Sequence, residues 1–170
     1  MSPRRDHVHR YAARCAWSGS TGVGYAGYSR QHEGTVDPVP GSLTLSADPA
    51  FRGDPAMVNP EQLLVLSASS CQLLSFLALA ARAGLDIVAY EDHAEAEMPE
   101  DDRPVRISHI TLRPRITIAA GSPPDAIERA HSLVSRAHDE CYVANSLTTT
   151  IMVEPEIIVS DSSAVGSRPA

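Results

Sequence analysis

The chain has 170 residues, 43% of them hydrophobic, which is enough to bury one sizeable core and too little for two ordinary domains. Its formal net charge of −7 at pH 7 and its scattered arginines disfavour binding to a nucleic-acid backbone. The three cysteines, an odd number, argue against a framework of structural disulfides, and the first ten residues lack the apolar segment of a secretory signal. We therefore expect one cytoplasmic domain over residues 1–170, with an ordered core at residues 8–159 and a flexible tail at residues 160–170.

Two short strands are expected in the first third of the chain. Apolar residues alternate along residues 8–17, which is typical of a half-buried strand and turns Cys15 inward. A glycine-rich stretch leads to the polar run at residues 28–33, and residues 41–47 predict another short strand. The prolines of residues 48–60 indicate a loop.

The clearest helix is predicted at residues 60–83. Asn59 is a favourable N-cap, Pro60 and Glu61 suit the first turn, and Gly84 is a natural C-terminal stop. The helix would be about 36 Å long and is apolar nearly all round. Its uncharged stretch approaches the length of a membrane span, but the serines and the glutamine within it favour a core helix. Since one sheet layer cannot cover every side of such a helix, we predict an obligate homodimer.

The second half of the chain predicts three longer strands and a second helix. The strands are expected at residues 87–98, 105–118 and 150–159. A shift in the phase of the apolar residues indicates a bulge near His109, and Pro114 favours an edge strand.

The second helix is predicted to begin at residues 122–125. Its apolar residues recur at steps of three and four, which places them on one face. They are Ile127, Ala130, Val134, Ala137 and Cys141. The best apolar partner for this face is the first helix, so Cys141 is expected to point toward it.

Two cysteines are candidates for redox chemistry. Cys71 lies near the middle of the first predicted helix, where the helix dipole contributes little, so a reactive thiolate there requires a basic group from elsewhere. A disulfide needs Cα atoms within about 7 Å, and packed helices lie about 8 to 10 Å apart, so Cys71 and Cys141 can meet. Two separate, inert core cysteines remain the alternative.

Several other chemistries lack their motifs. The sequence has no C-x-x-C, H-E-x-x-H, G-x-S-x-G, Walker A or G-x-G-x-x-G pattern. His131 and His138 precede Cys141 on the second predicted helix, so a Cys/His metal site is an alternative, although no compact four-ligand pattern accompanies them.

Three parts of the chain carry a recognisable pattern: Asn59-Pro60-Glu61-Gln62-Leu63 with Ser-Ala-Ser-Ser-Cys71 and Ala83-Gly84-Leu85; the run from Ile110 to Ile118; and Ala137-His138-Asp-Glu-Cys141-Tyr-Val-Ala-Asn-Ser146. Together they resemble the OsmC/Ohr family, named for osmotically inducible protein C and organic hydroperoxide resistance protein. The resemblance covers most of the chain. It implies an α+β fold in which two chains intertwine as a homodimer, with two long central helices flanked by antiparallel β-sheets.

The resemblance also implies an activity, that of a thiol-dependent peroxidase that reduces organic hydroperoxides or hydrogen peroxide in the response to oxidative stress. Cys71 matches the peroxidatic position, Cys141 the resolving position, and Glu61 the acidic residue of the active-site motif. The implied cycle passes through a Cys71 sulfenic acid and a Cys71–Cys141 disulfide. An external dithiol, on a lipoyl-bearing or a thioredoxin-like protein, then reduces the disulfide, and no metal, flavin or nicotinamide cofactor is implied.

The catalytic arginine of the family is not found at its expected place. Aligning the early W-S-G segment with the W-x-G pattern of the family puts Ser20, Thr21 or Gly22 there. Arg30 is the nearest basic candidate for stabilising the thiolate and the leaving oxygen, with Glu61 to orient it. A surface arginine in a loop is the alternative interpretation of Arg30.

Two further classes of function stay open from the sequence. One is a non-catalytic dimer of the same fold that binds a small ligand or senses redox state, with the cysteines merely packed. The other is a metal-binding protein. Neither nucleic acid nor a membrane is expected as a partner.

Overall fold

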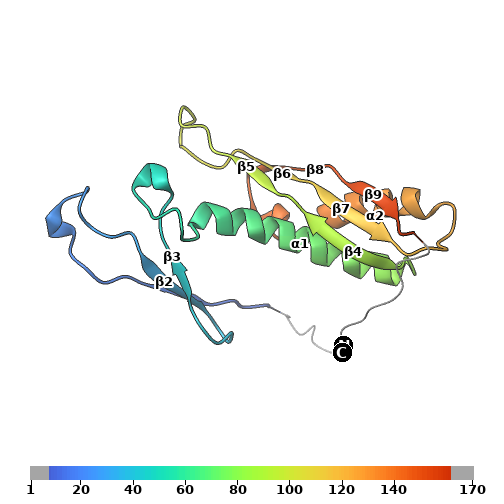
Figure 1. Cartoon of the computed structure of the whole chain (residues 1–170), viewed down its shortest axis with the longest axis horizontal. Coiled ribbons are helices and arrows are strands. Elements are labelled where there is room, and N and C mark those ends of the chain that lie inside the picture. The colour runs from blue at the N-terminus through green and yellow to red at the C-terminus, as the bar shows by residue number, and fades with distance from the viewer. Residues whose placement is uncertain (1–7, 162–170) are drawn as a thin grey trace, which may run out of the picture. The chain divides into compact units, whose positions relative to one another are not determined.

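The computed structural model describes residues 8–161, and Figure 1 traces their elements along the chain. The chain forms two compact units whose boundary lies between Leu63 and Leu64, here called the N-terminal and the C-terminal unit. The predicted single domain stays a prediction. Of the predicted tail, residues 162–170 lie outside the described residues, whereas the N–H of Ser160 donates to the carbonyl of Ile118 at 2.8 Å.

The N-terminal unit contains one antiparallel sheet in the order β1-β2-β3, formed by β1 (Ala13–Ala16), β2 (His32–Val36) and β3 (Leu43–Leu45). Strand β2 was not predicted, because its sequence His-Glu-Gly-Thr-Val has little apolar alternation. The prediction that Cys15 points inward is wrong: all four residues of the edge strand β1 are exposed in the chain. Alternation identified the strand but not a layer that covers it.

The loop after β3 is shaped by one glycine. A Cβ atom on Gly53 would lie 1.6 Å from the backbone oxygen of Ala47, so only glycine fits where the chain doubles back. A short 3-10 helix, Pro49–Phe51, begins with Asp48, whose carboxylate accepts the N–H of Ala50 at 2.8 Å. The loop therefore returns to β3 before the long helix begins.

Helix α1 spans Pro60–Arg82, as predicted to within one residue. Its start is a capping box: the side chain of Asn59 accepts the N–H of Gln62 at 2.8 Å, and that of Gln62 accepts the N–H of Asn59 at 3.1 Å. Its end is a Schellman motif, in which Gly84 has φ +66° and Leu85 N–H donates to the carbonyl of Ala80 at 3.0 Å. Local chemistry thus fixes both ends of the helix.

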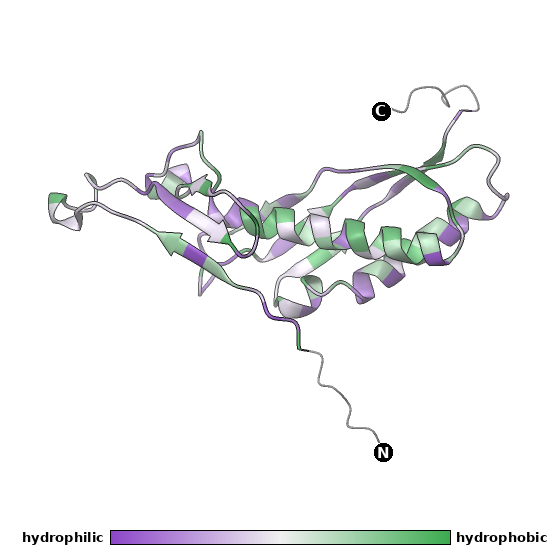
Figure 2. Cartoon of the chain, turned by 90° about the horizontal axis from the view of Figure 1, so that it is seen from below, coloured by the Kyte–Doolittle hydropathy of each residue, from purple (hydrophilic) through white to green (hydrophobic). Residues whose placement is uncertain are grey.

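One face of α1 is covered by the chain and another is not. Its buried residues are Ala68, Gln72, Phe76, Leu79 and Ala80, at helical spacing. Leu66 and Leu74 are more than 60% exposed, and Figure 2 shows apolar residues along the visible side of the helix. By length and composition alone α1 would also pass as a membrane span, a test that the core helices of soluble proteins pass too.

The C-terminal unit has two three-stranded sheets. One has the order β4-β7-β9, with β4 (Ile87–Asp92), β7 (Pro114–Ile118) and β9 (Glu156–Val159); the other has the order β5-β6-β8, with β5 (Glu95–Glu97), β6 (His109–Leu112) and β8 (Thr150–Val153). Each of the three long strands that the sequence predicted is broken into two, and its halves belong to different sheets. The pairs β7–β9 and β6–β8 are parallel, so the predicted antiparallel sheets are in fact mixed.

Arg113 contacts residues at all three points where a predicted long strand is broken in two. It lies between β6 and β7, its guanidinium pairs with Glu95 at 2.6 Å and Glu154 at 3.1 Å, and its N–H donates to Asp92 at 2.7 Å. Asp92 in turn accepts the hydroxyl of Ser69 on α1. These groups are largely exposed, so each ion pair contributes little to stability, but together they mark the line where the chain passes from one sheet to the other.

Two details predicted for this region are wrong. Strand β7 is the central strand of its sheet, and Pro114 is its first residue, a position where a strand tolerates proline. The expected bulge near His109 is replaced by a strand start, since β6 begins at His109 in regular register with both neighbours. The register shift of this unit lies instead in β4, between Ile87 and Ala89.

Helix α2 spans Ala126–Asp139, so only α1 is long. Its buried face is Ala126, Ala130, Val134 and Ala137, and it packs with α1 and β7 in one core that includes Phe76 and Ile116. Ile127, predicted to lie on this face, is 40% exposed, because Ala126 takes its place. The fold is α+β, as predicted, whereas the homodimer stays a prediction.

Candidate active site

The C-terminal unit brings Cys71 and Cys141 together. Cys71, in the middle of α1, is half-buried, and Cys141 is 1% exposed. The two thiols are hydrogen-bonded to each other although 70 residues separate them in the chain, and both are free. The expected meeting of the two cysteines is therefore present in this unit, by packing of α2 against α1.

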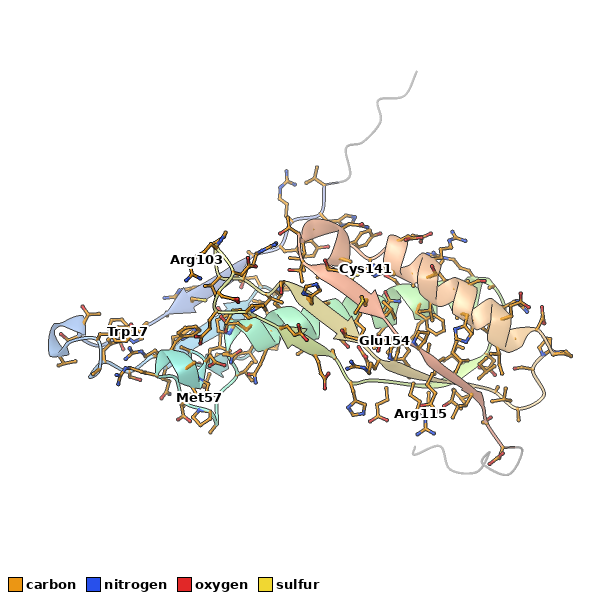
Figure 3. All side chains as sticks on the ribbon, turned by 90° about the horizontal axis from the view of Figure 1, so that it is seen from above. Trp17, Met57, Arg103, Arg115, Cys141 and Glu154 are labelled. Atoms are coloured by element: carbon orange, nitrogen blue, oxygen red, sulfur yellow. The ribbon has the colours of Figure 1, made fainter. Side chains whose placement is uncertain are left out.

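The turn after α2 holds Cys141 in place. Cys141 follows the last turn of α2 (Figure 3), and its N–H donates to the carbonyl of His138 at 3.1 Å. Its carbonyl accepts the N–H of Asn145 at 3.0 Å. Two amides of this turn face sulfur: the N–H of Val143 donates to Sγ of Cys71 at 3.5 Å, and that of Ala144 to Sγ of Cys141 at 3.4 Å.

The environment of Cys141 disfavours its thiolate. Burial, and then the hydrogen bond with the Cys71 thiol, raise the pKa of Cys141 from 9.0 to about 11. The amides of Ala144 and Val143 act in the opposite direction but do not outweigh burial. At neutral pH Cys141 is a protonated thiol, so the more exposed Cys71 is the better placed of the two to attack a substrate.

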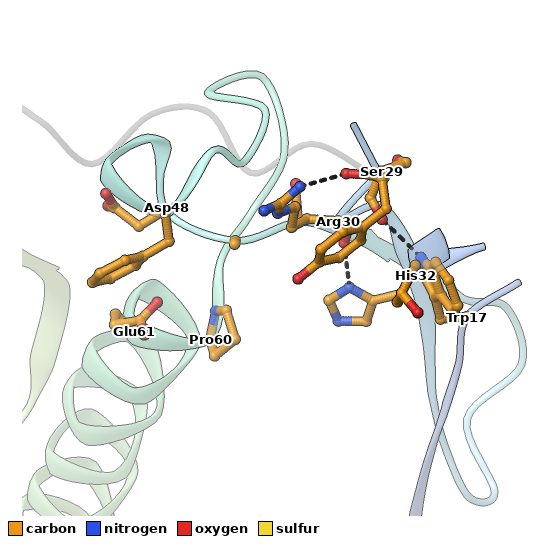
Figure 4. A pocket seen from close by; sticks show the side chains of 12 residues that line it. Trp17, Ser29, Arg30, His32, Asp48, Pro60 and Glu61 are labelled. Atoms are coloured by element: carbon orange, nitrogen blue, oxygen red, sulfur yellow. Dashed lines mark hydrogen bonds between the residues drawn. The ribbon is translucent and has the colours of Figure 1, made fainter. Parts of the chain in front are cut away.

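The N-terminal unit contains a cavity of about 340 Å³ that both Arg30 and Glu61 line. Figure 4 shows it with Trp17, His32 and Asp48 on its walls. The cavity is largely apolar in its lining and carries a few charged groups, which is the usual make-up of a small-molecule site. The sequence predicted neither this cavity nor its aromatic wall.

Arg30 is fixed within its own loop. One amino group of its guanidinium donates to the carbonyl of Tyr25 at 2.6 Å, the other to the carbonyl of Tyr28, and the cation lies 3.8 Å from the centre of the Tyr28 ring and 4.7 Å from that of Tyr25. Trp17 packs edge-on against Tyr28 and donates its indole N–H to the carbonyl of Ser29 at 2.8 Å. Arg30 and Glu61 share the cavity without a hydrogen bond between them.

Helix geometry constrains how Glu61 and Cys71 can act together. Both lie on α1, ten residues apart, which corresponds to about 15 Å along the axis. Because the helix begins at Pro60, Glu61 is part of its first turn, and one arginine head of the same chain is not expected to contact both groups.

Two polar atoms near the thiols are buried without a partner within residues 8–161. They are Oε1 of Gln72, the residue after Cys71, and Nδ1 of His138, three residues before Cys141. Gln72 does donate its amide N–H to the carbonyl of Val134 on α2 at 3.1 Å. Within the same residues, no cluster of three or more His, Cys, Asp or Glu side chains is placed to hold a metal ion.

The fold and the cysteine pair agree with a family that comparison identifies. The model of the family of OsmC-like proteins matches residues 53–156, more than half of the chain, and the chain belongs to this family. An OsmC-like protein from Vibrio cholerae shares 26% sequence identity and superimposes with a TM-score of 0.78 over 88% of this chain and 100% of its own.

More distant relatives share the fold. An organic hydroperoxide resistance protein from Legionella pneumophila, 16% identical, gives a TM-score of 0.62 over 92% of this chain and 100% of its own. The organic hydroperoxide resistance protein OhrB of Bacillus subtilis, also 16% identical, gives 0.56 over 88% of this chain and 98% of its own. The protein YmaD of Bacillus subtilis is 19% identical over 89% of this chain and 95% of its own length.

Proposed function

We propose that the protein is a cysteine-based hydroperoxide reductase, with Cys71 as the attacking thiol and Cys141 as the resolving thiol. The observation that carries the proposal is a pair of hydrogen-bonded thiols of unequal exposure, one half-buried and one fully buried. A peroxidase needs this asymmetry, because the attacking sulfur must meet the substrate and the resolving sulfur must not be consumed by it.

The chemistry balances with the two thiols and an external dithiol. The Cys71 thiolate attacks the distal oxygen of a hydroperoxide, the O–O bond breaks, and the alkoxide takes a proton to leave as an alcohol. The Cys71 sulfenic acid then condenses with the Cys141 thiol, whose proton leaves with the hydroxyl group as water. The resulting disulfide is reduced by thiol–disulfide exchange with a dithiol, such as that of a lipoyl-bearing protein, in the cytoplasm.

The comparisons support a peroxide-related role at the level of the family. The relatives from Legionella pneumophila and Bacillus subtilis are named organic hydroperoxide resistance proteins, and each is covered almost completely by this chain. A passive ligand-binding dimer does not require two thiols in contact, and that contact favours redox chemistry over it. Repeated turnover with an external dithiol separates a peroxidase from a redox sensor, which would use the same pair.

We further propose that the protein is a homodimer and that Arg30 and Glu61 complete the site of the partner chain. The exposed leucines of α1 supply an apolar surface for a second copy. The separation of about 15 Å between Glu61 and Cys71 along α1 argues against one arginine that serves both within a chain. In this proposal Arg30 stabilises the thiolate and the departing oxygen, and Glu61 orients it.

The test is a count of free thiols before and after one equivalent of an organic hydroperoxide. We expect the count to fall from three to one, with Cys15 remaining, and to return to three after addition of a dithiol. Peptide mapping should find the Cys71–Cys141 linkage. A count that stays at three, in protein shown to be folded, would exclude the proposed reaction.

A further inference from the structure

We infer that the backbone N–H groups of Val143 and Ala144 form a cradle for the two sulfurs, which stabilises the Cys71 thiolate and then the Cys141 thiolate as each is needed. The two amides are consecutive. The N–H of Val143 donates to Sγ of Cys71 and that of Ala144 to Sγ of Cys141, and the Val143 amide also acts on Cys141, whose pKa it lowers. The cradle would serve the proposed peroxidase reaction. Its expected effect on peroxide turnover rests on that proposed function, whereas its expected effect on the alkylation of Cys71 does not.

The first argument is the accounting of backbone donors in the turn. The N–H groups of Cys141, Asn145 and Ser146 are all bonded to carbonyls, of His138, Cys141 and Val143 respectively. Of the three amides in between, those of Val143 and Ala144 are directed to sulfur instead. Both bonds are partly buried, so the two sulfurs satisfy donors that water reaches only in part.

Cys71 needs a hydrogen-bond donor of this kind to stabilise its thiolate. It lies in the middle of α1, beyond the reach of the positive end of the helix dipole. Hydrogen bonds to a charged acceptor are roughly twice as strong as those to a neutral one, so an N–H directed at Sγ favours the thiolate over the thiol. The Val143 amide is a donor that requires no arginine at the position where related sequences are expected to carry one.

The same turn serves both steps of the proposed reaction, the attack of Cys71 on the peroxide and the attack of Cys141 on the Cys71 sulfenic acid. Cys141 is protonated at neutral pH, and it must lose its proton as it attacks the Cys71 sulfenic acid. The Ala144 amide already lies 3.4 Å from Cys141 Sγ, so it can stabilise the negative charge as it develops. The proton leaves with the hydroxyl group as water, and both sulfurs end neutral in the disulfide.

The decisive change removes the Val143 N–H and leaves every side chain in place. Replacing Val143 by its α-hydroxy acid analogue converts its amide to an ester, and the same replacement at Asn145 is the matched control, since the Asn145 amide donates to the carbonyl of Cys141 and not to sulfur. We expect iodoacetamide to alkylate Cys71 about tenfold more slowly at pH 7 in the Val143 ester, and at the wild-type rate in the Asn145 ester. Equal rates in both esters and wild type would overturn the cradle.

Two further measurements keep the inference testable if the ester does not fold. Val143→Pro removes the same N–H, and Val143 has φ −66°, which fits the proline ring. In wild-type protein, the amide proton resonance of Val143 should shift when Cys71 is alkylated, because its acceptor changes, and that of Asn145 should not. A Val143 resonance that is indifferent to alkylation of Cys71 contradicts the cradle.

Peroxide turnover separates the two proposals. If wild type reduces the hydroperoxide and the Val143 ester loses about the same tenfold factor in rate as in alkylation, both proposals hold. If the Val143 ester is alkylated more slowly than wild type but wild type does not reduce hydroperoxide, the peroxidase proposal fails and the cradle stands. If wild type reduces hydroperoxide and the ester is unaffected in both assays, only the cradle fails.

Discussion

The two units hold their candidate residues by different means. In the N-terminal unit, Arg30 is fixed by Tyr25 and Tyr28, five and two residues away, in a loop that is mostly exposed. In the C-terminal unit, Cys71 meets the Val143 amide across 72 residues of sequence, through the packing of two helices and a sheet. The first arrangement is local and tolerant of distant change, whereas the second depends on the whole core.

The comparison predicts that substitutions act differently in the two units. A change in the N-terminal unit should alter the surroundings of the cavity and leave the fold intact. A change in the core of the C-terminal unit should affect stability and the thiol pair together, because the same contacts support both.

The largest effect is expected from Cys71→Ser, which should reduce hydroperoxide consumption to the background rate, since no other thiol combines exposure with a resolving neighbour. Cys141→Ser should permit one oxidation and leave Cys71 as a sulfenic or over-oxidised species. Cys15→Ser is the control and should turn over at the wild-type rate, because Cys15 lies on an exposed edge strand. Steady-state assays and intact-mass analysis measure all three, and undiminished turnover in Cys71→Ser would exclude the mechanism.

Truncating a large side chain should lower the free energy of unfolding more in the C-terminal unit than in the N-terminal unit. Phe76 is fully buried and packs 5.9 Å from the centre of the Tyr90 ring, so Phe76→Ala should lower the free energy of unfolding by about 3 to 5 kcal/mol. Phe51, on the wall of the cavity, is 42% exposed, and Phe51→Ala should cost about 1 kcal/mol or less. Denaturant titration measures both, and similar losses would refute the contrast between the units.

Stability should fall as the pH rises through the range in which Cys141 titrates. Its pKa is about 11 in the folded chain and about 9 in the unfolded one, so the folded state holds more protons between these values and the free energy of unfolding decreases with pH there. Cys141→Ser should flatten the slope between pH 9 and 10; above pH 10 the raised pKa of Tyr90, caused by burial, adds an effect of the same sign.

The sequence predicted best what local chemistry determines. The ends of α1 were predicted to within one residue because a capping box at Asn59 and a left-handed glycine at Gly84 act over a few residues. Helical periodicity also predicted Ala130, Val134 and Ala137 on the buried face of α2, although the helix ends at Asp139, before Cys141. These features hold regardless of what the rest of the chain does.

The sequence failed where distant partners decide. The break of each long strand depends on Arg113 and the three acidic residues that it joins, which are far apart in sequence. The inward orientation predicted for Cys15 required a covering layer that the chain itself does not supply. The cavity around Arg30 and the amides of the turn after α2 carry no periodic signal, because backbone N–H groups belong to every sequence alike.

A smaller effect, of opposite sign, is expected at Gln72. This residue is 1% exposed, and its Oε1 has no partner among the described residues, while its amide N–H bonds to the carbonyl of Val134. Leucine of similar volume would lose one hydrogen bond and remove one unsatisfied buried oxygen, so Gln72→Leu should stabilise the fold by about 1 kcal/mol. Thermal and denaturant unfolding measure the change; a loss of more than about 1 kcal/mol would mean that Oε1 has a partner, such as a buried water.

The smallest effect is expected from Arg30, which we propose to act on the Cys71 thiolate of the partner chain. If Arg30 supports the Cys71 thiolate as proposed, Arg30→Ala should slow alkylation of Cys71 by iodoacetamide about threefold at neutral pH, the size expected for a partly exposed charge interaction. Reduction of hydroperoxide should slow further, because the guanidinium would also stabilise the departing oxygen.

Arg52→Ala is the matched control, since Arg52 lies 5.7 Å from the centre of the same Tyr25 ring but does not line the cavity that Arg30 shares with Glu61. Alkylation rates across pH for wild type and both variants decide the matter. A shifted profile for Arg52→Ala with an unchanged one for Arg30→Ala would transfer the role to Arg52, and two unchanged profiles would leave the backbone amides as the support of the thiolate.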